Sequence, residues 1–104
     1  MNDSVVYVVT DPGGKEISLA RDFGKLHVIL TGKEDRLTVM DKLNDALSKM
    51  RPQDYLLPIG SPINMGIAFH FAFIYCDGSV QVLSWDRQAY KYNEETITIE
   101  YDTN

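Results

Sequence analysis

The chain has 104 residues, of which 44% are hydrophobic and 24% are charged. This length suits one domain with one core, and the composition excludes the weakly hydrophobic class of disordered chains. Fifteen acidic residues against ten lysines and arginines give a net charge of −5, and the basic residues are scattered along the chain. Duplex nucleic acid is held through clustered basic residues, so we expect no duplex binding.

Cysteine and histidine are scarce. Cys76 is the only cysteine, which excludes an intramolecular disulfide and fits a reducing, cytoplasmic location. His27 and His70 have no partner at metal-ligand spacing, so we expect no metal and no cofactor. The longest apolar stretch, residues 63–76, is interrupted by polar residues and is too short to cross a membrane.

The first half of the chain predicts two strands separated by an ambiguous segment. Residues 4–10 are almost all β-branched or aromatic, as in a strand covered on both faces. Residues 25–30 have apolar side chains at every second position, which share one face, and predict a second strand. Residues 16–23, between the two, fit either a short strand or a helical turn.

A helix should follow the second strand. Apolar residues recur at spacings of three or four from Leu37 to Met50 and form one stripe, and Pro52 prevents the helix from continuing. Thr31 and Glu34 fit a capping box at the start of this helix.

The second half predicts a strand, a helix and a strand. Residues 54–59 form a short strand, in which Pro58 favours an edge position or a bulge. Ser61 is a good N-cap, because its side-chain oxygen can accept an unpaired N–H group at the start of a helix. Pro62 is a good first helical residue, because no N–H donor is required at that position. After the helix, residues 79–85 form another strand, so residues 54–85 predict a right-handed βαβ crossover with parallel strands.

The helix of this crossover is apolar on nearly every side. We therefore expect it to be buried almost all round, against the sheet and against another element or a partner chain, with His70 buried as well. Gly78 suits the left-handed position after its end. Residues 96–101 alternate between polar and apolar side chains and predict an added antiparallel strand.

Together these elements predict one α/β domain spanning residues 1–104. It should have two or three layers, a mixed sheet of about five strands and two main helices, with one βαβ crossover at residues 54–85.

Gly60 and Ser61 are the residues at which a small ligand is expected to bind, if one binds. They lie where a strand ends and a helix begins, so backbone N–H groups and the helix dipole converge on an anion such as a phosphate or a nucleotide. No glycine-rich phosphate-binding motif is present, and helix capping already explains Ser61.

The second candidate site is a polar and aromatic cluster near the end of the chain. Aromatic residues and arginine are favoured at protein interfaces, so this cluster predicts contact with a protein partner. An alternative is a hairpin in which tyrosine rings cover the edge of the sheet, and a third is stacking on single-stranded nucleic acid, which the acidic charge disfavours. The cluster consists of Trp85, Arg87, Tyr90 and Tyr92.

The second half of the chain resembles small uncharacterised proteins encoded by bacteriophages. The resemblance rests on residues 54–57, on Gly60-Ser61-Pro62, and on Trp85-Asp86-Arg87-Gln88 followed by Tyr90 and Tyr92. It implies a phage accessory protein that acts in the host cytoplasm through binding more than through chemistry.

We therefore expect a binding or regulatory module with no catalytic residues. It would act through protein contacts, on a host factor or by self-association as a homodimer. The alternative function is binding of a small anionic ligand at Gly60 and Ser61.

Overall fold

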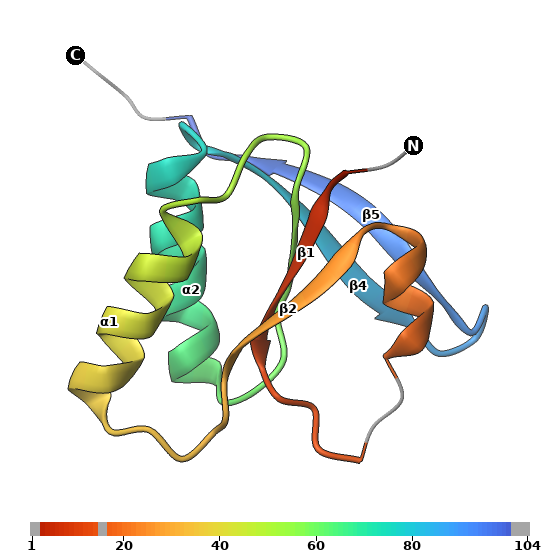
Figure 1. The fold of residues 1–104 in the computed structure, drawn as a ribbon. Helices are drawn as coiled ribbons and strands as arrows, with labels where there is room; N and C mark the ends of the chain where they lie inside the picture. Colours follow the sequence, from red (N-terminus) through yellow and green to blue (C-terminus); the bar gives the residue numbers. More distant parts are fainter. Residues whose placement is uncertain (1–2, 15–16, 101–104) are drawn as a thin grey trace.

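The computed structural model describes residues 3–14 and 17–100, which form a five-stranded sheet flanked by helices (Figure 1). The strand order is β2-β1-β3-β4-β5. The first four strands are parallel, and β5 is antiparallel to β4. The strands are β1 (Val5–Thr10), β2 (Lys25–Leu30), β3 (Tyr55–Leu57), β4 (Ser79–Asp86) and β5 (Lys91–Thr98).

The helices α1 (Arg36–Leu47) and α2 (Pro62–Tyr75) lie side by side on one face of the sheet, and the short 3-10 helix η1 (Ser18–Asp22) lies on the other (Figure 1). Right-handed crossovers explain this division. The chain moves across the sheet in one direction from β1 to β2 and in the opposite direction from β2 to β3 and from β3 to β4. The predicted α/β class, mixed sheet and crossover are thereby confirmed.

Two apolar clusters hold these layers together. The larger lies between the sheet and the two α-helices, and the smaller lies between the sheet and η1. Five consecutive residues of β1, Val6–Thr10, are buried, as predicted for a strand covered on both faces.

Three predicted details are wrong. The N-cap of α1 is Asp35, whose side chain accepts the N–H of Thr38 at 2.8 Å. Glu34 instead accepts the N–H groups of Thr31 and Gly32, and the bond from Thr31 is the main reason that the pKa of Glu34 is far below its usual value.

The strand β3 lies inside the sheet and ends before Pro58, so this proline occupies neither an edge nor a bulge. The last strand begins at Lys91 rather than at Thr96.

Within the single chain, α2 is not buried all round. Only Ala68 and Ala72 are fully buried, whereas Ile63 is 61% exposed and Ile74 54% exposed. His70, expected to be buried, is exposed, and its ring lies 5.4 Å from that of Phe71. The sheet covers one side of α2 and α1 covers a second, so its outer side faces solvent in the single chain.

Candidate functional site

A pocket of about 580 Å³ opens on the η1 face of the sheet, at the carboxyl ends of β3 and β4. The sheet and the loops build it together, because alternate residues of β4 point to this face and the chain turns back into β5 at its rim. Its lining residues are Ile17, Leu57, Pro58, Ile59, Leu83, Ser84, Trp85, Arg87, Tyr90 and Tyr92. The structure therefore brings all four residues of the predicted aromatic cluster into one pocket.

The aromatic rings form one wall of the pocket. The ring of Trp85 packs edge to face against those of Tyr90 and Tyr92, with centroids 5.0 and 4.9 Å apart. Tyr92 is buried and belongs to the core under η1, whereas Trp85 is 39% exposed and Tyr90 67% exposed. Tyr92 thus covers the sheet, while the other two rings are open to a ligand.

The turn between β4 and β5 sets the position of Tyr90. One carboxylate oxygen of Asp86 accepts the N–H groups of Gln88 and Ala89, at 3.0 and 3.1 Å. The bond from Ala89 is the main reason that the pKa of Asp86 lies below its usual value. The turn then closes at Tyr90 with φ of 53°, a left-handed conformation that glycine usually provides.

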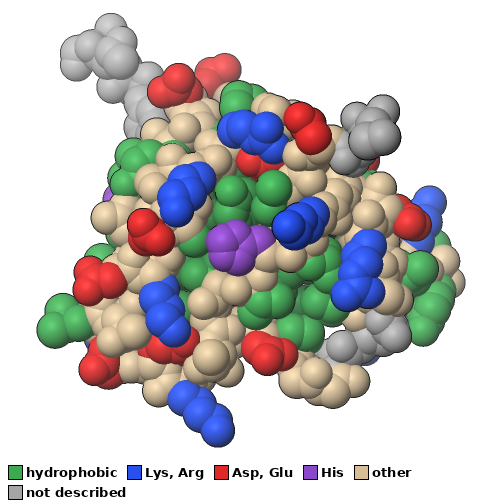
Figure 2. Space-filling view, in the orientation of Figure 1, with side chains coloured by type: hydrophobic (Ala, Val, Ile, Leu, Met, Phe, Trp, Pro, Cys, Tyr) green, Lys and Arg blue, Asp and Glu red, His purple; other side chains and the backbone are tan. Residues whose placement is uncertain are grey.

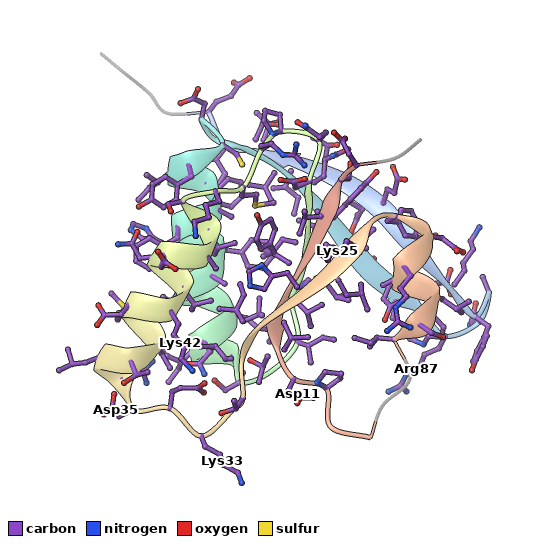
Figure 3. All side chains as sticks on the ribbon, in the orientation of Figure 1. Asp11, Lys25, Lys33, Asp35, Lys42 and Arg87 are labelled. Atoms are coloured by element: carbon purple, nitrogen blue, oxygen red, sulfur yellow. The ribbon has the colours of Figure 1, made fainter. Side chains whose placement is uncertain are left out.

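Arg87 carries the positive charge of the pocket. Its side chain is exposed, and it makes no hydrogen bond or ion pair with any residue in the described part of the chain. Figure 3 shows it on the same side of the sheet as η1. The neighbouring Asp86 uses its carboxylate on backbone N–H groups and on the side chain of Asn93, and it forms no ion pair with Arg87. An apolar pocket with a free guanidinium suits a group that is both apolar and anionic.

Gly60 and Ser61 have structural roles. The Ser61 hydroxyl accepts the N–H of Asn64 at 3.2 Å and so caps α2. Gly60 has φ of 126°, and a side chain at this position would place its Cβ atom 2.4 Å from Oγ1 of Thr10. The pocket reaches Pro58 and Ile59 of the same loop, but its lining does not include Gly60 or Ser61. The two predicted sites, Gly60-Ser61 and the aromatic cluster, therefore do not line the same pocket.

Sequence reasoning missed part of the pocket and one ion pair that involves a buried carboxylate. Ile17, Pro58 and Ile59 contribute to the pocket through loops. Asp54 is completely buried: its carboxylate accepts the N–H groups of Val5 and Arg51, both at 2.8 Å, and the Arg51 guanidinium at 3.0 Å. This pair holds β1 and the start of β3 together and lies at the opposite end of β3 from the pocket.

The remaining chemically active groups form no second site. Among residues 3–14 and 17–100, no three histidine, cysteine or acidic side chains are grouped to hold a metal ion. No helix in these residues is long and apolar enough to span a bilayer. Cys76 is buried against the carbonyl of Met50, and burial raises the pKa of its thiol. Figure 2 shows acidic and basic side chains interspersed over the visible face.

The sequence matches the family described as phage Pam3 gp32-like protein over residues 4–99. The chain belongs to this phage protein family. The match covers nearly the whole chain, so the resemblance to phage proteins is not limited to the second half, where residues 54–57, Gly60-Ser61-Pro62 and the aromatic cluster lie. No curated protein and no solved structure shows a significant match.

Proposed function

We propose that this member of the phage Pam3 gp32-like family is a non-enzymatic protein-binding module. Its pocket would receive an apolar side chain of a partner protein, with an acidic group of the same partner against Arg87. The observation that carries the proposal is the combination of open Trp85 and Tyr90 rings with an arginine that has no partner in the described part of the chain.

The composition of the pocket favours a protein partner. Tryptophan, tyrosine and arginine contribute most of the binding energy at protein interfaces when they surround a pocket that excludes water. Among the described residues that line the pocket there is no carboxylate, histidine or thiol, so this part of the lining offers no general base beside a nucleophile. The partner would be a host protein met in the cytoplasm or another phage protein.

The backbone at Tyr90 supports the same proposal. A left-handed conformation costs a tyrosine about 1 kcal/mol more than a glycine. Its edge-to-face contact with Trp85 offsets an energy of similar size, and its ring is still mostly exposed. The fold therefore holds an exposed tyrosine ring at the rim of the pocket, where a partner can contact it.

Trp85 provides a direct measurement, because it is the only tryptophan of the chain. We would select peptides from a random library on the full chain and titrate the selected peptides against tryptophan fluorescence. Selected sequences should combine an aromatic or aliphatic residue with a nearby acidic residue. Arg87→Ala should weaken their binding by about tenfold, the loss of one charged contact, whereas Arg36→Ala, an exposed arginine at the start of α1, should have no effect.

Tyr90→Gly separates binding from folding. It should keep or raise the melting temperature, because it relieves the left-handed strain, and it should weaken peptide binding. The proposal fails if no peptide perturbs Trp85, or if selected peptides bind the Arg87→Ala and Tyr90→Gly variants as tightly as the unaltered chain. The alternative of a small anionic ligand at Gly60 and Ser61 predicts that inorganic phosphate or a nucleotide raises the melting temperature of the full chain, because a ligand of the folded state stabilises it.

A further inference from the structure

The outer edge of β5 offers backbone groups that no described residue uses. β5 is the last strand of the sheet and pairs on one side only, with β4 (Figure 1). Ile99 directly follows β5, and its N–H donates to the carbonyl of Gly78 at 2.8 Å, so its backbone groups face β4. Because these groups alternate in direction along a strand, those of Glu94, Thr96 and Thr98 face outward, where another strand could bind them.

The side chains at the middle of β5 select against a second copy of this chain. Glu94 and Glu95 lie at the middle of the strand, whereas its one lysine, Lys91, lies at the start. An antiparallel copy centred on the strand would place the glutamates opposite one another, and like charges in that position are unfavourable. Charged side chains commonly protect an exposed edge in this way. The edge therefore suits a partner strand of different sequence.

The same two carboxylates favour a basic partner. Both are exposed, and neither forms an ion pair with a described residue. The Tyr55 hydroxyl donates to Glu94 at 3.2 Å, which leaves the charge of the carboxylate in place. Glu94 and Glu95 project from opposite faces of the sheet, because neighbours in a strand alternate. Two adjacent basic residues on an added strand would therefore lie beside one glutamate each.

The edge of β5 leads to the pocket. Tyr92 of β5 lines the pocket, and its side chain shares a face of the sheet with that of Glu94, two residues further on. An extended chain covers the distance from Tyr92 to Glu95 in three residues, about 10 Å. A segment that runs along β5 thus reaches the rim of the pocket within a few residues.

We infer that the partner proposed above adds a strand to the edge of β5, with two adjacent lysines or arginines beside Glu94 and Glu95. Main-chain hydrogen bonds supply affinity in this mode of recognition, and the side chains supply specificity. The inference rests on the proposed function, because it assigns a second part of the same partner segment. That segment carries an apolar and an acidic residue for the pocket, and the basic pair about three residues away.

Amide hydrogen exchange tests the strand addition residue by residue. Peptides selected on the full chain, as described for the pocket, should slow exchange at the outward N–H groups of Glu94, Thr96 and Thr98 by about tenfold or more at saturation. The N–H groups of Glu95 and Ile97 face β4 and serve as the internal control, so their exchange should change much less. The expected pattern therefore alternates along β5.

The variant Glu95→Lys tests the charge. It should weaken the binding of selected peptides by about fivefold or more, because a like charge replaces an opposite one. Replacing the basic pair of the peptide by two glutamates should restore binding to this variant. Asp41→Lys is the matched control, because it makes the same change of net charge at an exposed position of α1, and it should leave binding unchanged. Circular dichroism would verify that both variants fold.

The strand addition and the proposed function can fail separately. Peptides that perturb Trp85 but leave exchange at the outward N–H groups unchanged would overturn the strand addition and leave the pocket as a binding site. Peptides that perturb Trp85 and bind Glu95→Lys as tightly as the unaltered chain would do the same. If no selected peptide perturbs Trp85, the proposed function fails, and the strand addition fails with it.

Discussion

At the scale of single residues, the Thr10 hydroxyl stands out because it is buried with no hydrogen-bond partner among the described residues. It lies against Gly60 at the carboxyl end of β1, where it fills the space that a side chain at Gly60 would need. The pair explains the glycine in this loop through packing, without a phosphate.

Thr10→Val should stabilise the protein. The change removes an unsatisfied buried hydroxyl and keeps the branched shape, which is worth about 1 kcal/mol. Urea unfolding would measure the gain, and Thr96→Val, at an exposed position of β5, serves as the control with little expected effect. A loss of stability in Thr10→Val would show that the hydroxyl has a partner in solution.

At the scale of elements, two residues after α2 have positive φ. Gly78, with φ of 85°, was expected to be left-handed, but Asp77 before it has φ of 54° as well, and Gly78 donates its N–H to the carbonyl of Phe73 at 2.8 Å. The Asp77-Gly78 pair indicates the end of the helix, but the sequence did not show that the aspartate also adopts this conformation.

Asp77→Gly should therefore stabilise the protein by about 0.5 to 1 kcal/mol, because glycine adopts this conformation without strain. Thermal unfolding would measure the shift. Asp45→Gly is the contrasting variant, because it places glycine inside α1, and it should destabilise by a similar amount. If Asp77→Gly and Asp45→Gly changed the stability of the protein in the same direction and by the same amount, the strain at Asp77 would be contradicted.

At the scale of the whole molecule, the buried Asp54 connects segments far apart in sequence. Asp54 directly precedes β3. Its carboxylate binds Val5 at the start of β1 and Arg51 in the loop after α1. These contacts fix how the first strand docks beside the third, which is the pairing at the centre of the sheet.

Asp54→Ala should destabilise the fold by about 3 kcal/mol, because it leaves two backbone N–H groups without their acceptor and breaks the pair with Arg51. Urea unfolding would measure the loss. Asp41→Ala, at an exposed position of α1, should change stability little. A small effect of Asp54→Ala would mean that water replaces the carboxylate.

The sequence predicted what depends on local chemistry. Local structure follows from three features: the Ser61-Pro62 cap, the β-branched residues of β1 and the aromatic cluster. The rule of right-handed crossovers then predicts that the strands joined by a helix are parallel. The exposed side of α2 was not predictable, because burial depends on how many layers the chain builds. The pocket was predictable only in part, because Ile17 and Ile59 reach it from separate loops.

Strand β4 divides its residues between two unrelated surroundings. Val80 and Val82 contact the layer of α1 and α2, whereas Leu83 and Trp85 lie on the η1 face. Because neighbouring residues of a strand point to opposite sides, one inserted residue would send every later side chain to the wrong side. Evolution of this protein should therefore change the strand by substitution and change its length only in the turn that follows Asp86.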